Sequence, residues 1–294
     1  MPFRCGAGLQ ACQTSVLAWL VLAAAAAAAG QPAPPTRISP HVYVIPPGGG
    51  ASANVGVIVG DRATLIIDGG RSSAAEGRAL ARTIASLARG TDVFLVSTEF
   101  QRAESAQPEG FPGSVKVVRT RAQQQDVDEF APGTLRAADV YFTSDYTLDL
   151  GGVEVQLLAL GPAHTRGSIG VFVAGERVLF AGGVVTDRAF LSYASPYARP
   201  PAWLASLERL ERLRPLRVIP RRGGSGTASM LEAAGAYIET VQARVAELSP
   251  SFESVDALVA QLTNELVEAY PDWSDRAEIA GAVTAAYAEL RERD

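Results

Sequence analysis

The chain offers few side chains with the chemistry that catalysis or metal binding requires. It contains two histidines, His41 and His164, and two cysteines, Cys5 and Cys12, among 294 residues. Zinc is bound mainly by imidazole, thiolate and carboxylate groups. Two histidines cannot build a histidine-rich shell around several zinc ions, so the composition alone argues against a multinuclear site of that kind.

Other catalytic motifs are missing from the sequence as well. No G-x-S-x-G segment signals the nucleophile of an α/β-hydrolase, and no G-x-G-x-x-G segment signals a dinucleotide site. The single lysine, Lys116, follows a valine, so the chain has no phosphate-binding P-loop. The segment RRGGSGT, which starts at Arg221, could present an arginine and backbone amides to an anion, but a glycine-rich loop does not need a ligand.

The composition is that of a folded, acidic protein. Hydrophobic residues make up 48% of the chain and charged residues 19%, which excludes a disordered protein. The net charge is −5 and the pI is near 5.3. Nucleic-acid binding requires a basic surface that neutralises phosphates, so we expect no nucleic-acid partner.

Residues 1–29 are predicted to be a secretory signal peptide. Arg4 is followed by an apolar run over residues 15–29 and then by the proline-rich segment GQPAPPT, which is the pattern of a cleaved signal. Cleavage near Ala29 removes both cysteines. We expect an exported protein, in the periplasm or outside the cell, that touches a membrane only if the signal persists as an anchor. Residues 30–40 are predicted to be a linker.

Beyond residue 40 the hydrophobic pattern predicts strands first and helices later. Short β-branched runs end in glycine or turn residues, and two of them form hairpins around residues 151–152 and 175–177. Helical spacing of apolar residues appears at 72–88, at 203–213 and from 228 to the end. This order, without strict alternation of strands and helices, predicts an α+β fold in which sheets pack face to face with helices outside.

Five segments resemble signature segments of the metallo-β-lactamase superfamily, in the family's order and spacing. They are ANVGVIVGDRATLIIDGG, VFLVSTEFQRAE, LGPAHTRGSIGVFV, RVLFAGGVV and LRPLRVIPRRG. The resemblance implies an αββα sandwich over residues 41–226, with the active site at one edge between the sheets. It also implies that residues 227–294 form extra helices packed on the same domain.

The resemblance further assigns seven positions that hold two zinc ions in family members. The residues at these vestigial metal-site positions are Glu99, Gln101, Ala103, Glu104, His164, Gly183 and Arg222. Of these, His164 alone matches the family's ligand. Glycine and alanine have no ligand atom, and an arginine cannot lose its proton to coordinate a metal. We therefore expect no metal and no other cofactor.

Two functions compete on this basis. The first is a pseudo-hydrolase without metal that binds a small molecule or a protein. The alternative is a hydrolase that reuses the same cleft, with catalytic candidates Glu99, Glu104 and His164. Two carboxylates and one histidine match the ligands of a mononuclear iron or manganese site, and they could also do acid–base chemistry without metal. The sequence names no ligand and leaves monomer and dimer open.

Several charged side chains receive a prediction of their own. Arg222 is predicted to fill the vacated metal site by pairing with Glu99 and Glu104, helped by neighbouring arginines such as Arg166. The resemblance implies a structural role for Asp68 beneath the site. Asp126, Asp128 and His41 are predicted to lie on the surface.

Overall fold

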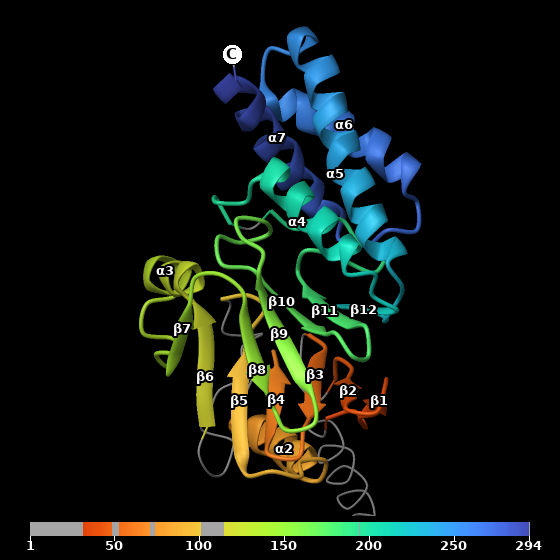
Figure 1. Cartoon of the computed structure of the whole chain (residues 1–294). Helices are drawn as coiled ribbons and strands as arrows, with labels where there is room; N and C mark the ends of the chain where they lie inside the picture. Colours follow the sequence, from red (N-terminus) through yellow and green to blue (C-terminus); the bar gives the residue numbers. More distant parts are fainter. Residues whose placement is uncertain (1–31, 49–52, 71–73, 101–114, 194, 294) are drawn as a thin grey trace, which may run out of the picture.

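Two β-sheets packed face to face form the centre of the computed structural model, which describes residues 32–48, 53–70, 74–100, 115–193 and 195–293 (Figure 1). Within these residues the first sheet has seven strands in chain order: β1 Thr36–Arg37, β2 Val42–Ile45, β3 Val55–Val59, β4 Ala63–Ile67, β5 Asp92–Val96, β6 Val115–Thr120 and β7 Val140–Phe142. The described part of the second sheet has the order β12-β11-β10-β9-β8, with β8 Tyr146–Asp149, β9 Glu154–Ala159, β10 Ile169–Val173, β11 Val178–Gly182 and β12 Arg217–Pro220.

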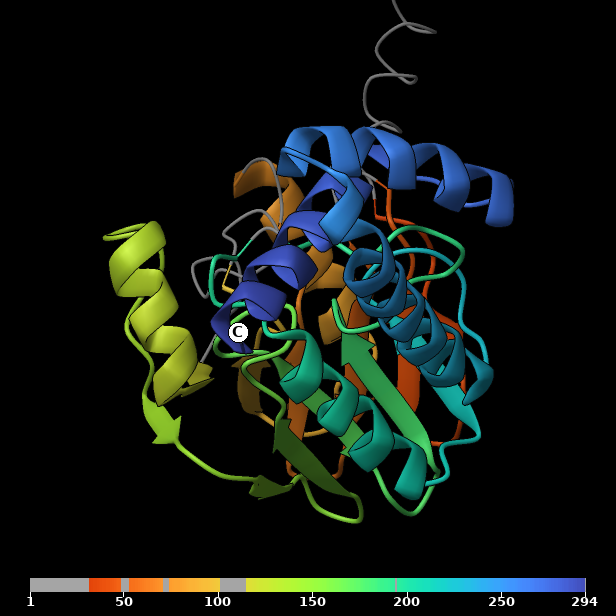
Figure 2. The ribbon, with the colours of Figure 1, turned by 90° about the horizontal axis from the view of Figure 1, so that it is seen from above.

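Helices cover the outer faces of both sheets. They are α2 Ala74–Ala85, α3 Arg121–Phe130, α4 Pro200–Arg212, α5 Ser229–Leu248, α6 Val255–Ala269 and α7 Ile279–Arg293, with short 3₁₀ turns η2 Ser249–Ser251 and η3 Arg276–Glu278. Helices α4 to α7 gather at one end of the molecule and α2 lies at the other (Figure 1). Seen from above, α3 lies to one side of this helical layer (Figure 2). Among the described residues, no helix combines the length and apolar character needed to cross a bilayer.

Among the described residues, three apolar clusters fill the spaces between these layers. One lies between the two sheets and includes Ile58, Leu65, Leu157 and Val171. A second joins the first sheet to Leu80 and Ile84 of α2. A third joins the second sheet to helices α4 to α7. The apolar faces of the strands and helices are buried by packing against one another in these clusters. The predicted αββα sandwich with C-terminal helices is confirmed.

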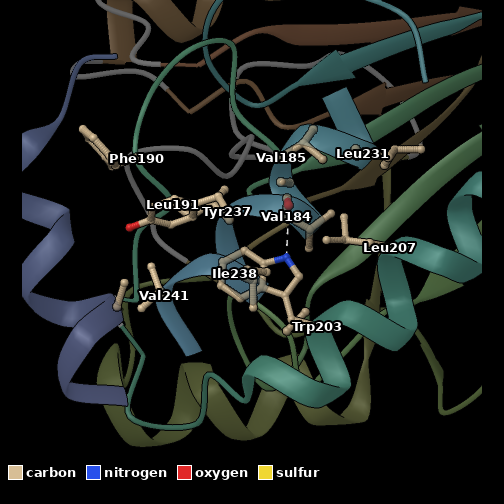
Figure 3. Close-up of a cluster of buried hydrophobic side chains, with 14 of the residues drawn as sticks. Val184, Val185, Phe190, Leu191, Trp203, Leu207, Leu231, Tyr237, Ile238 and Val241 are labelled. Atoms are coloured by element: carbon tan, nitrogen blue, oxygen red, sulfur yellow. Dashed lines mark hydrogen bonds between the residues drawn. The ribbon is translucent and has the colours of Figure 1, made fainter. Parts of the chain in front are cut away.

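The C-terminal helices bury their apolar stripes within this chain. Helix α5 buries Leu231, Ala234, Tyr237, Ile238, Val241 and Val245, and α6 buries Leu258, Leu262 and Leu266. Figure 3 shows several of these side chains beside Trp203 of α4 and the loop after β11. Each fully buried side chain of this size contributes about 1.5–3 kcal/mol relative to exposure, which fixes the helical layer on the second sheet.

Three elements were not predicted from the hydrophobic pattern. Helix α3 is polar, and it begins directly after β6 because the Thr120 Oγ1 accepts a hydrogen bond from the Gln123 amide at 2.9 Å. Strand β7 is three residues long and lies parallel to β6. The predicted linker contributes β1, whose Thr36 and Arg37 pair with β2.

His41 links the two sheets. Its Nδ1 lies 2.5 Å from Oε1 of Glu176, in the turn between β10 and β11, and the Ser39 hydroxyl donates to the same carboxylate. The His41 side chain is 28% exposed. Burial raises the pKa of Glu176, but the hydrogen bonds from Ser39 and His41 outweigh burial and lower the pKa below its usual range. The predicted surface position is therefore only partly correct, since the imidazole is held in a contact between sheets.

Candidate functional site

The predicted site residues follow strands that run parallel to a neighbour. Strands β4, β5 and β6 are parallel in the first sheet, and β11 and β12 are parallel in the second. The carboxyl ends of parallel strands meet at one sheet edge. Glu99 follows β5, Gly183 follows β11 and Arg222 follows β12, while His164 lies in the loop between β9 and β10. The two edges are joined where the Ile169 amide donates to the Thr98 carbonyl at 3.0 Å.

Glu99 lies beneath the site as a buried hydrogen-bond acceptor. The residue is 1% exposed. Its Oε2 accepts a hydrogen bond from the Thr165 hydroxyl at 2.7 Å, and Ser168 Oγ lies 3.3 Å from the same oxygen. Its Oε1 accepts from the Gly183 amide at 3.3 Å. One carboxylate thus connects the loop that carries His164 with the end of β11.

His164 is also buried, at 1% exposure, and its ring is held from two sides. Nδ1 lies 2.6 Å from the Ser192 carbonyl and donates to it, since a carbonyl can only accept. The ring centroid lies 5.9 Å from that of Trp203. The Trp203 indole donates to the Val184 carbonyl at 3.0 Å, the bond drawn in Figure 3. The fully buried Trp203 therefore supports both His164 and the chain that follows β11.

Gly183 has no room for a larger side chain. A Cβ atom added there would lie 2.6 Å from Cδ2 of His164 and 3.0 Å from Oε1 of Glu99. Contacts this short require a neighbour to move, and both neighbours are buried and hydrogen-bonded. The space beside Gly183 is filled by the imidazole and the carboxylate.

A cavity of about 470 Å³ lies above these residues. Its lining comes from His164 and Gly183, the loop after β11, the residues after β12, and the connection between α6 and α7. Among the described residues of this lining, Arg221 and Arg222 are cationic, and Asp187, Asp275 and Glu278 are anionic. Glu99 does not line the cavity.

Two long-range contacts hold the loop that carries Arg222. The Asn54 side-chain amide donates to the Pro220 and Gly223 carbonyls at 2.9 and 3.0 Å. On the other side, the Gly224 amide donates to Oδ2 of Asp187 at 2.9 Å. Asn54 is buried, so both carbonyls are satisfied away from water. The loop is therefore fixed to both sheets.

The family model described as the metallo-beta-lactamase superfamily matches residues 95–220, which include the cavity floor and both parallel strands of the second sheet. Residues 95–220 of this chain belong to the metallo-beta-lactamase superfamily.

Solved structures with the same fold differ from this chain in sequence. A metallo-beta-lactamase from Pontibacter korlensis superposes with a TM-score of 0.57 at 19% identity, over 69% of this chain and 96% of that one. The DIM-1 metallo-beta-lactamase gives 0.57 at 19% identity, over 70% and 96%. A double mutant of the sec-alkyl sulfatase PisA1 gives 0.71 at 15% identity, over 88% of this chain and 50% of that one. No curated protein matches the sequence.

The match to the sulfatase covers 88% of this chain, which is more than all the residues that precede α5. That likeness therefore includes part of the C-terminal helical layer. At these identities the structural comparisons establish the fold, and the chemistry has to be judged from this chain's own residues.

The described residues do not fit the two-zinc centre of the superfamily. Gly183 has neither a ligand atom nor space for one, and Arg222 offers a guanidinium that cannot coordinate. Across the described ranges, no three His, Cys, Asp or Glu side chains converge to hold a metal ion. The predicted positions Gln101, Ala103 and Glu104 lie outside the described residues, as does the predicted pairing of Glu104 with Arg222.

Asp68 occupies the structural place that the resemblance implied. Its carboxylate accepts from the Thr98 amide at 2.7 Å and from the Thr98 hydroxyl at 2.9 Å, and its own φ is 60°. Because the residue is 3% exposed, these bonds fix the turn that leads from β5 to Glu99. Asp68 does not line the cavity.

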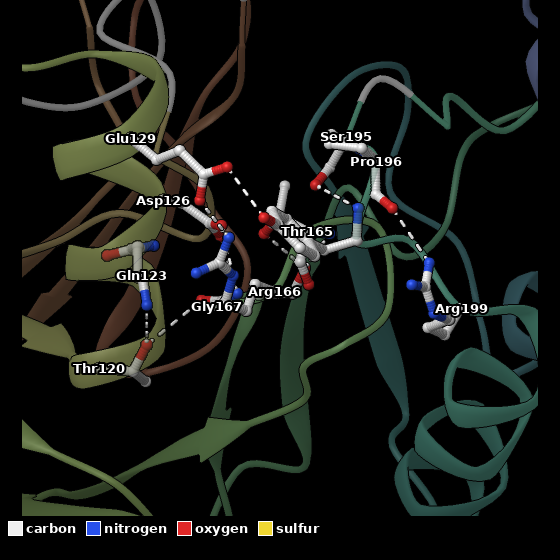
Figure 4. A network of polar contacts seen from close by, with 12 residues as sticks. Thr120, Gln123, Asp126, Glu129, Thr165, Arg166, Gly167, Ser195, Pro196 and Arg199 are labelled. Carbon is white, nitrogen blue, oxygen red and sulfur yellow. Dashed lines mark hydrogen bonds and ion pairs between the residues drawn. The ribbon is translucent and has the colours of Figure 1, made fainter.

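The prediction of a surface position is wrong for Asp126. The residue is 0% exposed, and its carboxylate faces Arg166 at 3.2 Å and accepts from the Gly167 amide at 3.1 Å (Figure 4). Burial raises the pKa of Asp126 to about 6, although Gly167 and Arg166 act in the opposite direction. The polar helix α3 docks on the His164 loop through this contact, which the pattern of α3 does not reveal.

Arg166 belongs to the same contact. It pairs with Glu129 at 2.6 Å and lies over the Tyr197 ring, 3.7 Å from its centroid. The Tyr197 hydroxyl also donates to Glu129 at 2.8 Å. Arg166 was expected to compensate the vacated metal site, but the structure instead shows it joining α3 to the loop after β9 and to the segment ahead of α4.

Proposed function

We propose that this protein binds a small molecule in the cavity above His164 without using a catalytic metal. The proposal rests on two features next to Gly183, a filled ligand position and an open cavity. The space that a ligand side chain at residue 183 would need is filled by His164 and Glu99, while a cavity of about 470 Å³ lies directly above. This volume lies within the range of about 300–1,000 Å³ that is typical of small-molecule sites.

The alternative, a metal-free acid–base hydrolase in the same cleft, has less support. Glu99 lies under the cavity floor, and both its oxygens accept hydrogen bonds from Thr165, Ser168 and Gly183. A general acid or base has to reach the reacting atom directly or through one water. Among the described candidates, His164 alone lines the cavity.

Metal analysis tests the first part of the proposal. The purified protein is incubated with zinc, manganese and ferrous iron, desalted and analysed for bound metal. We expect less than a tenth of an equivalent of each. Stoichiometric metal that a chelator removes would overturn the metal-free proposal.

Ligand screening tests the second part. Ser274 is an exposed residue that lines the cavity, and Ser274→Trp is designed to plug it. Ser144→Trp, at an exposed turn away from the cavity, is the matched control. A library of neutral, anionic, cationic and zwitterionic compounds is screened by thermal shift. Compounds that stabilise the wild type and Ser144→Trp but not Ser274→Trp support cavity binding, and a screen without such compounds refutes it.

We also propose that the protein is exported after removal of residues 1–29. The support is the charged, apolar and small-residue pattern of this segment. Expression of the full-length chain followed by mass spectrometry should give a mature protein that starts near residue 30 and lacks Cys5 and Cys12. An intact N-terminus in a cytosolic fraction would contradict this proposal.

A further inference from the structure

We infer that the connection between α6 and α7, residues 270–278, is a gate that controls the entry of small molecules into the cavity above His164. We call this connection the strap. It supplies Ser274, Asp275 and Glu278 to the cavity lining. The inference rests on the proposed binding function, because it concerns the same cavity, and it follows from the way the strap is attached to the sandwich.

The strap forms one side of the cavity mouth. In the described lining, the exposed residues belong to two segments: Arg222 and Gly223 after β12, and Ser274 and Asp275 of the strap. A residue that lines a cavity and is also exposed to solvent lies at its entrance. The entrance is therefore bounded by the loop after β12 on one side and by the strap on the other.

These two sides are attached to the sandwich to different extents. The loop after β12 is held by the side chains of Asn54 and Asp187, as described above. Among the described residues, two hydrogen bonds join the strap to the sandwich, and both involve the Ser274 backbone. The Ser274 amide donates to the Arg188 carbonyl at 3.0 Å, and the Phe190 amide donates to the Ser274 carbonyl at 3.1 Å. Release at a single residue therefore breaks both bonds.

The backbone on both sides of this attachment is strained. Ala189 and Ser274 pair in an isolated parallel bridge. Arg188, which precedes Ala189, has a φ of 50°, and Asp275, which follows Ser274, has a φ of 58°. The left-handed region costs free energy in residues that carry a Cβ atom, because this atom approaches the following carbonyl oxygen. The closed strap stores this strain, and opening of the bridge releases it.

Trp273 opposes the release of the strap. Its ring packs on Phe190 and Tyr237, with ring centroids 5.4 and 5.7 Å apart. Trp273 is only partly buried, and residues 274–277 are exposed. Segments with exposed backbone and few buried contacts open locally at a lower free energy than the whole protein unfolds. The strap thus combines a small apolar contact that closes it with a strained bridge that favours opening.

The helices on either side of the strap keep this opening local. Leu266 near the end of α6 is 3% exposed, and Ile279 at the start of α7 is 0% exposed. Both belong to the apolar cluster that joins the C-terminal helices to the second sheet. The strap can therefore separate from residues 188–190 while α6 and α7 stay in place.

Thiol labelling of Ala189→Cys by N-ethylmaleimide tests whether the strap opens. Ala189 lines the cavity, is 8% exposed and pairs with Ser274. The full chain also carries Cys5→Ser and Cys12→Ser, so the introduced thiol is its only one. The references are Ser144→Cys at an exposed turn and Val171→Cys in the buried strand β10.

We expect Ala189→Cys to react at least about tenfold more slowly than the exposed reference and at least about a hundredfold faster than the buried one. A rate equal to that of the exposed reference would show that the strap does not restrict entry. A rate equal to that of the buried reference would show that entry requires global unfolding. Either result would overturn the inference.

Variants of the strap in the Ala189→Cys background test the cause of opening. Asp275→Val should raise the labelling rate about tenfold, because a β-branched residue disfavours a φ near 58°. Asp275→Asn should leave the rate unchanged, because asparagine tolerates this conformation. Arg214→Val is the matched control, since Arg214 is exposed, has a φ of 51° and lies outside the cavity lining. Equal rates for Asp275→Val and Arg214→Val would refute the role of the strap.

A cross-link separates failure of the gate from failure of the proposed function. Residues paired across a β-bridge lie within the Cα separation that a disulfide spans, so Ala189→Cys and Ser274→Cys together can lock the strap. Compounds from the thermal-shift library that bind the reduced pair should bind at least about tenfold more slowly after oxidation. Equal rates would overturn the gate and leave the proposed function intact. If labelling shows opening but no compound binds in the cavity, the proposed function fails and the gate stands.

Discussion

Introducing a carboxylate at the vestigial metal-site position 183 with Gly183→Asp should destabilise the protein instead of creating a metal site. The Cβ common to alanine and aspartate would lie 2.6 Å from Cδ2 of His164. Overpacking of a well-packed core costs about 1–3 kcal/mol, so Gly183→Ala should lose about 2 kcal/mol of unfolding free energy. His164 and Glu99 have little room to move, because both are buried and hydrogen-bonded.

Aspartate adds an electrostatic cost to this steric one. Its carboxylate would approach Oε1 of Glu99, which lies 3.0 Å from the added Cβ. Two like charges about 4 Å apart repel by roughly 4 kcal/mol at an effective dielectric constant of about 20, and proton uptake by one of them limits that cost. We expect Gly183→Asp to lose at least about 4 kcal/mol at pH 7.5, a large part of the roughly 5–15 kcal/mol of a typical domain.

Urea unfolding followed by circular dichroism measures these losses. With an m-value of about 3 kcal/mol/M, the midpoint should fall by roughly 0.7 M for Gly183→Ala and by more than 1 M for Gly183→Asp. Gly77→Ala is the matched control, because a Cβ added at Gly77 in α2 meets nothing within 4 Å, and it should be neutral or stabilising by up to about 1 kcal/mol. A Gly183→Ala variant as stable as this control, or a stable Gly183→Asp variant that binds zinc stoichiometrically, would refute the assignment of a filled site.

Three further perturbations test the contacts around the site. Glu99→Ala should lower the unfolding free energy by about 3 kcal/mol, because it removes the acceptor of buried donors. Glu99→Gln should lower it less, and equal urea midpoints for the two variants would contradict the role of Glu99 as a buried acceptor. The raised pKa of Asp126, about 6, means that protonated Asp126 is favoured in the fold. Its stabilising effect is fully present below about pH 4 and is lost as the pH rises through about 6. Asp126→Asn should remove this pH dependence, so its unfolding free energy should rise relative to that of the wild type by up to about 3 kcal/mol between pH 4 and 7. The same difference in urea midpoint between variant and wild type at pH 4.5 and at pH 7 would refute this prediction. Asn54→Ala should lower the unfolding free energy by about 2 kcal/mol, because it removes the donor to the Pro220 and Gly223 carbonyls. It should also speed amide hydrogen exchange at residues 221–224, and unchanged exchange there would show that the loop does not depend on Asn54.

The framework of this protein is readable from its sequence because it depends on local patterns. Short β-branched runs that end in glycine, and apolar residues three and four apart in the later part of the chain, suffice to predict the strands and the C-terminal helices. The two hairpins, at residues 151–152 and 175–177, follow from the same local signals. Helix α3 could not be predicted from these local patterns because its sequence is polar. Its position depends on Asp126 and Arg166, which are far apart in the chain.

The sequence also shows, without the fold, that two of the vestigial positions cannot bind a metal. A glycine at residue 183 and an arginine at residue 222 exclude two ligands whatever the fold does, because neither side chain can coordinate zinc. The sequence did not determine what replaced the ligands. The predicted pairing of Arg222 with Glu104 stays a prediction. The structure places Glu99 beneath the floor with hydroxyl and amide donors, and it places Arg222 on the cavity lining.

The tertiary structure alone decided whether the vacated site was open or filled. Glu99, His164 and Gly183 come from three loops that the two sheets bring to one edge, and their contacts depend on distances of a few tenths of an ångström. Residue types and spacing along the chain carry no information at that scale. The same holds for Asn54 and the loop after β12, and for the wall that Asp275 and Glu278 add to the cavity. These contacts join residues far apart in sequence, and only packing of the C-terminal layer on the sandwich brings them together.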